Sequence, residues 1–342
     1  MNKELIQTKL SSHSDKTTWL ITGVAGFIGS HLLEFLLQCN QKVIGVDNFL
    51  TGKKTNLDLV KKNVSDHQWA NFKFKEIDIT NLDMCQDLFK NVDFVLHQAA
   101  LGSVPRSIDM PINSNNHNVT GFLNMLTLAK DKKVKRFIYA SSSAVYGDSQ
   151  KLPKKEGNEG FAVSPYGTTK VINELYSDVF SKSYSFKSIG LRYFNVFGER
   201  QDPFGSYAAV MPKWISSMIK NEDIFINGDG NTTRDFSYVG NIVNANILAV
   251  LAENEENTSM NIAMGGQTTL NQLFFKIKNT LENLGVKYSK EPIYREFRPG
   301  DILHSKADIS KAISKINYSA EYSLDYGIEK TVKFFLQNLN QN

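Results

Sequence analysis

Residues 18–31 read TWLITGVAGFIGSH, and this stretch decides the fold. The apolar run Thr18–Thr22 has the length of a buried strand, and apolar residues recur at helical spacing over Phe27–Leu37. Three glycines lie between the strand pattern and the first turn of the helical pattern, and glycine clusters of this kind are typical of tight turns. The stretch therefore predicts a strand, a glycine-rich turn and a helix, in that order.

The same alternation of strand and helix continues outward from this stretch. Short apolar runs predict four further strands, at Lys42–Val46, Phe72–Ile77, Val92–His97 and Arg136–Ala140. Helical stretches separate them, notably over Asn113–Lys130. Strands that alternate with helices form right-handed crossovers in a parallel sheet covered on both faces. We therefore predict an α/β fold built on a doubly wound parallel sheet of the Rossmann type.

The alternation weakens after about Leu191. Polar, loop-like segments follow at Arg192–Arg200, Gly228–Gly240 and Arg298–Ser305, with short helical stretches at Met211–Lys220 and Leu270–Leu284. A chain of 342 residues corresponds to two domains at about 100–200 residues each. We predict a dinucleotide-binding domain over residues 1–191 and a smaller α/β domain over residues 192–342, from which about 236–265 return to the first domain.

Composition and charge exclude several classes of protein. Apolar residues make up 41% of the chain and charged residues 22%, which are values of an ordinary globular protein. The 39 Lys and Arg exceed the 35 Asp and Glu by only four, and both signs are interleaved, so we predict no nucleic-acid partner. The polar start, Met1 to Thr18, and the lack of any apolar run of about 18 residues predict neither export nor a membrane span.

The chain has two cysteines, Cys39 and Cys85, which cannot form a disulfide framework. Neither has a Cys or His at zinc-ligand spacing, so we predict no metal site. Free cysteines are usually small buried residues, and we expect both thiols to be buried in a reducing, cytoplasmic setting.

The glycine-rich turn predicts a dinucleotide site. Its glycines are Gly23, Gly26 and Gly29. They permit a tight turn, the approach of backbone N–H groups to a pyrophosphate, and close packing of the helix on the sheet. Asp47 follows 18 residues after the last glycine, where a carboxylate accepts hydrogen bonds from an adenosine ribose and repels a 2′-phosphate. We therefore predict NAD rather than NADP, with Asp78 and Ile79 at the adenine edge; the alternative is a glycine-rich loop without a nucleotide.

Tyr166 and Lys170 are four residues apart in SPYGTTK, before a stretch that can continue as a helix over Val171–Phe180. Residues at this spacing share a helix face, so the ammonium can stabilise a tyrosinate, whereas a phenol of pKa about 10 is a poor base at pH 7. Three serines, 141–143, close the strand before them, at an edge where ligands bind. We predict that Tyr, Lys and Ser converge on one substrate hydroxyl; the alternatives are a solvated helix pair and a serine-rich turn.

In this order the motifs resemble those of the extended short-chain dehydrogenase/reductase family and, within it, the nucleotide-sugar 4-epimerases. The resemblance runs from about Trp19 to about Tyr326, through TGVAGFIGSHL, VDNFLTG, DIT, HQAA, SSSAVYGD, SPYGTTK, RYFNVFG, TTRDFSYV and RPGD. AALGSVPRS and the residues after RPGD are most similar to those of bacterial UDP-N-acetylglucosamine 4-epimerases.

The resemblance implies a role for each matching residue. Tyr166 is the general base for the sugar 4-hydroxyl, Ser142 hydrogen-bonds the same oxygen, and Lys170 holds the nicotinamide ribose. Ser143 faces the sugar ring. A hydride passes from sugar C4 to tightly bound NAD, the 4-keto sugar turns over about its diphosphate, and the hydride returns to the opposite face.

The resemblance also implies two sets of binding residues. The cofactor set is Gly23, Gly26, Phe27, Ile28, Gly29, Asp47, Asn48, Gly52, Asp78, Ile79, Gln98, Ala99, Ala100, Asn118, Ala140, Tyr166, Lys170, Tyr193 and Val196. The UDP-sugar set is Gly102, Ser103, Ser142, Ser143, Asn195, Ala209, Val210, Lys213, Phe225, Asn227, Arg234, Arg298, Asp301 and Ser305. The smaller domain then mainly binds the UDP-sugar, and helices near 113–130 and 164–181 resemble those that form family homodimers.

Two local features favour one reaction and one sugar. Related dehydratases and decarboxylases carry an acid in the loop after the catalytic Ser or Thr, but residues 142–145 read SSAV, so nothing local supplies the second acid or base that elimination needs. Ser305 stands where relatives restricted to non-acetylated hexoses carry tyrosine, which leaves room for an N-acetyl group. We predict interconversion of UDP-GlcNAc and UDP-GalNAc, with UDP-Glc and UDP-Gal as further substrates.

Three alternatives stay open. A UDP-N-acetylhexosaminuronic acid is a possible substrate, because Arg106 or another cation could face a C6 carboxylate. A non-catalytic NAD-binding sensor and a net redox enzyme are the others. Gly240 departs from the family, which usually has an acid there, and we predict a helix-capping position with a modest cost in stability.

Overall fold

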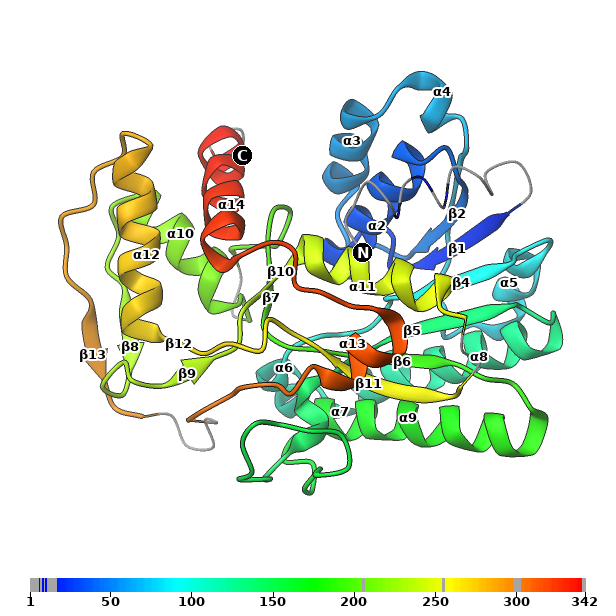
Figure 1. The fold of residues 1–342 in the computed structure, drawn as a ribbon. Helices are drawn as coiled ribbons and strands as arrows, with labels where there is room; N and C mark the ends of the chain where they lie inside the picture. Colours follow the sequence, from blue (N-terminus) through cyan, green and yellow to red (C-terminus); the bar gives the residue numbers. More distant parts are fainter. Residues whose placement is uncertain are drawn as a thin grey trace.

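The computed structural model describes Ile6, Thr8, Leu10 and residues 17–204, 207–253, 256–297 and 303–339. Its centre is a seven-stranded parallel sheet in the order β11-β6-β5-β4-β1-β2-β3 (Figure 1). The strands are β1 (Thr18–Thr22), β2 (Lys42–Asp47), β3 (Phe72–Glu76), β4 (Phe94–His97), β5 (Arg136–Ser142), β6 (Ile189–Tyr193) and β11 (Thr258–Ile262). The predicted doubly wound α/β fold is confirmed.

Helices cover both faces of this sheet (Figure 1). One face carries α2 (Phe27–Gln38), α3 (Lys54–Asn63) and α11 (Val239–Leu251), and the other carries α8 (Gly121–Asp131) and α9 (Pro165–Tyr184). Leu32 of α2 and Ile242 of α11 are fully buried in the first core, and Phe122 of α8 is fully buried in the second. Burial on both faces explains why the strands read as continuous apolar runs.

A second group of elements forms the C-terminal part, at the left of Figure 1. Its helices α10 (Val210–Ile219), α12 (Leu270–Asn283) and α14 (Leu324–Asn338) share a core that contains Trp214 and Phe274. Its strands pair in twos, β7 (Val196–Phe197) with β10 (Ser237–Tyr238), β8 (Phe225–Asn227) with β13 (Ile293–Arg295), and β9 (Thr233–Arg234) with β12 (Thr268–Thr269). The loops predicted at 192–200 and 228–240 are therefore wrong in part, because two-residue strands are too short to give a periodic pattern.

The predicted helix over 113–130 is interrupted. The chain forms α7 (Pro111–Asn115), a π-helical turn η2 (Asn116–Thr120) and then α8. Asn118, in this turn, accepts a hydrogen bond from Leu101 N (2.7 Å) and donates to the Thr169 hydroxyl (3.1 Å). The wide turn re-aims a side chain toward partners that no local pattern reveals, as such turns often do near functional sites.

The remaining short elements connect the larger ones. They are α4 (Asp66–Trp69), α5 (Leu82–Cys85), η1 (Gln86–Phe89), α6 (Val104–Asp109), η3 (Ser143–Tyr146) and α13 (Ser310–Ile316). Both cysteines are buried, as predicted. Within the part of the chain that the structure describes, none of the helices has both the length and the apolar composition that a membrane span requires.

Gly240 lies inside α11 rather than at its cap, so the predicted capping position is wrong. The residue before the helix is Tyr238, and a Cβ on Gly240 would lie 2.9 Å from ring atoms of both Tyr238 and Tyr322. The glycine thus makes room for two tyrosine rings, which is a packing reason that the sequence does not display.

Candidate active site

A cavity of about 630 Å³ lies where the carboxyl ends of β1, β2, β4, β5 and β6 meet the C-terminal part. Ligands of open α/β sheets bind at this edge. Many of the residues predicted for cofactor and substrate line it together: Gly23, Gly26, Phe27, Ile28, Gly29, Asp47, Asn48, Ile79, Gln98, Ala99, Ala100, Gly102, Ser103, Ala140, Ser142, Ser143, Tyr166, Lys170, Tyr193, Asn195 and Val196. They come from segments far apart in the sequence.

The glycine-rich loop forms one wall of the cavity. Gly23 has a positive φ of 69°, and a Cβ on Gly29 would lie 2.1 Å from the Gly23 carbonyl oxygen, so neither position accepts a side chain without a shift of the backbone. Helix α2 begins after Gly26 with neither a side-chain cap nor an acid in its first turn. Its first N–H groups are therefore suited to an anionic pyrophosphate.

Asp47 ends β2 beside this loop and also lines the cavity. Its two carboxylate oxygens accept hydrogen bonds from Ala25 N and Phe49 N, both at 2.9 Å. Burial raises the pKa of the Asp47 carboxyl, and these backbone hydrogen bonds oppose the rise. A carboxylate held in this way has lone pairs left for two ribose hydroxyls, so the residues present fit NAD.

Tyr166 is fixed in the first turn of α9 by its neighbours. The Ser164 side chain caps the helix by accepting from Gly167 N (3.0 Å), and Pro165 occupies the first helical position, which favours initiation there. Tyr166 N donates to the Ser107 hydroxyl of α6 (3.0 Å). The helix start therefore decides where the phenol enters the cavity.

Lys170 lies one turn further along α9, and its ammonium is 5.9 Å from the centre of the Tyr166 ring. It donates to the Ala140 carbonyl at 2.7 Å. Burial lowers the pKa of Lys170 to about 8, while Glu174 raises it. Burial raises the pKa of the Tyr166 phenol above its ordinary value, and a hydrogen bond with Ser142 opposes this. The sequence predicts that Lys170 stabilises the tyrosinate, but in this structure the pKa of Tyr166 is raised. A lowered pKa therefore requires a positive charge nearer to the ring than Lys170.

Three residues predicted for the cofactor do not line the cavity. Gly52 packs behind Asp47, because a Cβ there would lie 2.7 Å from a carboxylate oxygen. Asp78 accepts from Thr80 N (2.8 Å) and from the Asn48 amide (2.9 Å), so its carboxylate shapes the loop after β3. Asn118 is engaged with Leu101 and Thr169, as described above. All three stand behind residues that do line the cavity.

Seven of the fourteen residues predicted for the UDP-sugar lie in the C-terminal part, outside this cavity: Ala209, Val210, Lys213, Phe225, Asn227, Arg234 and Ser305. Arg234 in β9 follows Thr233, whose carbonyl accepts from Ser305 N at 3.1 Å. The Arg295 guanidinium lies 3.4 Å from the centre of the Phe225 ring. Arg298 and Asp301 lie outside the described residues, between β13 and Ser305.

Other cavity residues were not predicted from the sequence: Val46, Leu50, Thr51, Ile77, Leu101, Val104, His117, Ser141, Ala144 and Gln201. Most of them are neighbours of predicted residues in the same loops, so the motif boundaries could have been widened to find them. His117 and Gln201 belong to no recognised motif. Their contribution depends on the tertiary fold.

Arg106, considered for a sugar C6 carboxylate, does not line the cavity. Its guanidinium lies 5.1 Å from the centre of the Tyr207 ring, and the Tyr207 hydroxyl donates to Asp109 at 2.7 Å. These contacts connect α6 to the loop before α10. In this arrangement Arg106 faces an aromatic ring rather than the sugar site.

A helix that presents a phenol and an ammonium to a dinucleotide cavity can move a proton at a carbinol while a hydride leaves the same carbon. Enzymes of the extended short-chain dehydrogenase/reductase class work in this way, and the fold and the site assign this chain to that class.

Comparison with known proteins agrees with this class. The NAD dependent epimerase/dehydratase family matches residues 19–263, and the chain belongs to this family. A putative UDP-glucose 4-epimerase of Methanocaldococcus jannaschii is 37% identical over 321 residues, which are 93% of this chain and 98% of that protein. A UDP-glucuronate 4-epimerase of Thermodesulfobacterium geofontis is 34% identical over 330 residues, or 94% and 97% of the two chains.

A solved structure extends the comparison. The UDP-N-acetylglucosamine 4-epimerase from Methanobrevibacter ruminantium M1, in complex with UDP-N-acetylmuramic acid, has a TM-score of 0.85 and 38% sequence identity. The match covers 95% of this chain and 99% of that one. These relatives differ in the sugar named for them but share the 4-epimerase reaction.

Proposed function

We propose that this enzyme interconverts UDP-GlcNAc and UDP-GalNAc. The chain is an NAD-dependent nucleotide-sugar 4-epimerase, because the family, the relatives over nearly their whole length, and the dinucleotide cavity agree. The proposal goes further in naming an N-acetylated sugar as the substrate, and one observation supports this choice.

That observation is the small residue Ser305. The family resemblance places Ser305 where relatives restricted to non-acetylated hexoses carry tyrosine, and its backbone N–H donates to the Thr233 carbonyl, next to Arg234. The position is largely buried, with 8% of the residue exposed, so a larger side chain there would have to occupy protein interior or substrate space. A hydroxymethyl group leaves this volume to an N-acetyl substituent.

Tyr166, Ser142 and Lys170 supply the proposed chemistry of the chain itself. The ionised phenol of Tyr166 removes the proton of the sugar 4-hydroxyl and returns it in the reverse half-reaction, while Ser142 hydrogen-bonds the same oxygen. NAD, when bound, takes up the hydride from C4 and gives it back, and its nicotinamide cation favours the ionised phenol. Lys170 keeps a second positive charge near the phenol.

The lining of the cavity supports epimerisation over elimination. Among the described residues that line it, Asp47 is the only carboxylate, and backbone N–H groups hold it beside the glycine-rich loop. Elimination needs an additional acid or base near C5 or C6 of the sugar. Reversible oxidation at C4 needs only the Tyr, Ser and Lys set.

A UDP-N-acetylhexosaminuronic acid is the second candidate substrate. The similarity to a UDP-glucuronate 4-epimerase favours it. The contact of Arg106 with Tyr207 weighs against it, because this guanidinium is already covered by an aromatic ring. The acetylated neutral sugar is therefore preferred.

We also propose that the enzyme is a homodimer formed through α7 and α9. Ile112 is 77% exposed, and Leu175 and Val179 are 58% and 50% exposed on neighbouring helices that contact one another. A second copy of the same surface would bury these apolar side chains.

Analytical ultracentrifugation of the wild-type enzyme and of the variant Leu175→Glu tests the proposed dimer. The wild type should sediment as a dimer and the variant as a monomer, and a monomeric wild type would contradict the proposal.

A substrate comparison tests the proposed activity. Purified enzyme, without added NAD, is incubated with UDP-GlcNAc, UDP-Glc and UDP-GlcNAcA in parallel, and the C4 epimers are quantified. We expect the highest kcat/KM for UDP-GlcNAc. A higher kcat/KM for UDP-GlcNAcA, the N-acetylglucosaminuronic acid, favours the second candidate substrate. NAD-loaded protein that epimerises none of the three sugars is the result expected of a non-catalytic NAD-binding sensor.

A further inference from the structure

Arg192 is a buried charged residue beside the candidate active site, and it belongs to neither of the predicted sets of binding residues. It lies in β6 with 6% of the residue exposed. A buried guanidinium requires paired acceptors. Its Nε and Nη2 donate to the two oxygens of Glu174, at 2.9 and 2.7 Å, which is a bidentate ion pair. This ion pair therefore connects Arg192 of β6 to helix α9.

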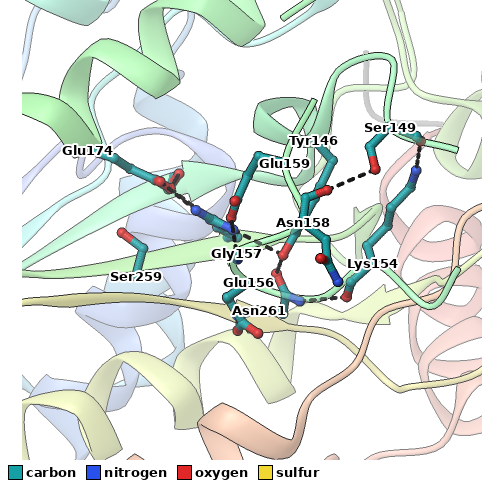
Figure 2. Close-up of polar contacts among 12 residues, drawn as sticks. Tyr146, Ser149, Lys154, Glu156, Gly157, Asn158, Glu159, Glu174, Ser259 and Asn261 are labelled. Atoms are coloured by element: carbon teal, nitrogen blue, oxygen red, sulfur yellow. Dashed lines mark hydrogen bonds and ion pairs between the residues drawn. The ribbon is translucent and has the colours of Figure 1, made fainter. Parts of the chain in front are cut away.

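Two further side chains complete this arrangement, which we call the Arg192 cluster: Arg192, Glu174, Glu159 and Tyr146. Nη1 of Arg192 contacts Glu159 and donates to the Tyr146 hydroxyl at 3.0 Å. The Tyr146 hydroxyl in turn donates to Asn261 of β11 at 2.7 Å. Figure 2 shows Glu174, Glu159 and Tyr146 converging, with Asn261 extending the network toward Lys154. Four segments of the chain therefore meet at one buried cation.

Glu174 touches the elements that carry the catalytic side chains. It follows Lys170 by one helical turn and Tyr166 by two, on the same face of α9. Its Oε1 also accepts a hydrogen bond from the Ser141 hydroxyl at 2.6 Å, and Ser141 precedes Ser142 at the end of β5. One carboxylate thus joins α9, β5 and β6 directly behind the site.

The titratable and charged groups around Lys170 are consistent with a role of Glu174 in keeping Lys170 charged. Tyr166 and Glu174 face it from its own helix, His97 from β4, and Arg192 lies beyond Glu174 on β6. Burial lowers the pKa of His97 to about 3, so this ring is neutral. Glu174 is the carboxylate that favours the charged form of Lys170 against burial.

We propose that Glu174 is a positioning residue for the epimerase reaction: anchored by Arg192, it holds α9 in register with the end of β5, so that Tyr166, Lys170 and Ser142 converge on one oxygen. The inference rests on the catalytic roles proposed above. Because misplacement of reacting groups by about 1 Å can cost about 100-fold in rate, loss of this anchor is costly without any loss of substrate contacts.

The test uses the NAD-loaded full-length enzyme and the variant Glu174→Gln. The amide keeps the size of the side chain but not its charge. We expect kcat to fall by about 10- to 100-fold, with the KM for the UDP-sugar and the NAD content unchanged. Ser141→Ala removes only one of the hydrogen bonds, and it should lower kcat by a smaller factor while leaving the ion pair intact, which keeps the test usable if Glu174→Gln folds poorly.

The pH profile distinguishes positioning from mere stability. Without the Glu174 charge, Lys170 loses its proton at lower pH, so the alkaline limb of kcat should move to lower pH in Glu174→Gln. Glu34→Gln is the matched control, because Glu34 of α2 also pairs with a buried arginine, Arg200, away from α9. This control should lower the melting temperature and leave kcat and the pH profile as in wild type.

Two outcomes overturn the inference. One is a Glu174→Gln enzyme whose kcat and alkaline limb equal those of wild type. The other is a decrease in activity that Glu34→Gln reproduces in full. If the wild-type enzyme itself epimerises no UDP-sugar, the proposed function fails instead, so the two failures are distinguishable.

Discussion

The cofactor part and the substrate part of the candidate site are built in different ways. The cofactor part lies where adjacent strands of one parallel sheet end, so the sheet fixes the loops that line it. The residues proposed for the UDP-sugar in the C-terminal part come from strands of two or three residues, such as β8 and β9, from the start of helix α10 and from loops. Changes in the first part should affect all substrates alike, and changes in the second should select among them.

The largest effect is expected for Tyr166→Phe. The variant lacks the phenol oxygen that we propose takes the 4-hydroxyl proton, so kcat should fall by about 10²- to 10⁴-fold on every UDP-sugar, with NAD retained. Tyr184→Phe is the matched control, since Tyr184 ends the same helix and is 56% exposed. Equal losses in both variants, or normal turnover by Tyr166→Phe, would remove Tyr166 from the mechanism.

Ser305→Tyr probes the substrate part. A bulky ring at this position should exclude the N-acetyl group and lower kcat/KM for UDP-GlcNAc by about 10- to 200-fold relative to UDP-Glc. Ser305→Ala, which adds no bulk, should leave this ratio unchanged. A ratio that Ser305→Tyr does not alter would mean that Ser305 does not limit the sugar pocket.

Gly29→Ala probes the cofactor part. The new Cβ would lie 2.1 Å from the Gly23 carbonyl oxygen, and relief of this overlap should cost about 1–3 kcal/mol and displace the start of α2. We expect less NAD in the purified protein and an equal loss of kcat/KM for all sugars. Gly266→Ala is the control, because a Cβ there meets nothing within 4 Å. A change in substrate preference in Gly29→Ala would break the division between the two parts.

The smallest effect is expected in the pH dependence of kcat. Burial lowers the pKa of Lys170 to about 8. The amine is charged below this value and neutral above it, so kcat should decline as the pH rises through about 8, equally for all substrates. A profile that stays level to about pH 10, near the ordinary lysine pKa, would contradict this.

The cofactor part could be predicted from the sequence because local backbone constraints identify it. Gly23 is required by its positive φ and Gly29 by its close contact with the Gly23 carbonyl, Asp47 stands at a strand end, and Tyr166 and Lys170 are one helical turn apart. Such features repeat at fixed spacing along the chain, so they can be recognised without knowledge of distant partners.

The rest depends on contacts between residues far apart in the sequence. Asn118 bridges Leu101 and Thr169, and Arg192, read as the start of a loop, is a buried residue of β6 that pairs with Glu174. Nothing near either residue reveals its partner. For the same reason the sequence around Gly240 predicts a helix cap and does not reveal that the rings of Tyr238 and Tyr322 pack against this glycine.

The central claim is that Tyr166 and bound NAD act at sugar C4 and return the same hydrogen to it. The most direct test incubates the enzyme with UDP-GlcNAc deuterated at C4, without added cofactor, and follows the label by NMR. The account predicts UDP-GalNAc with deuterium retained at C4 and no net reduced nicotinamide. Loss of the label to water, or its accumulation in reduced cofactor, would contradict the account.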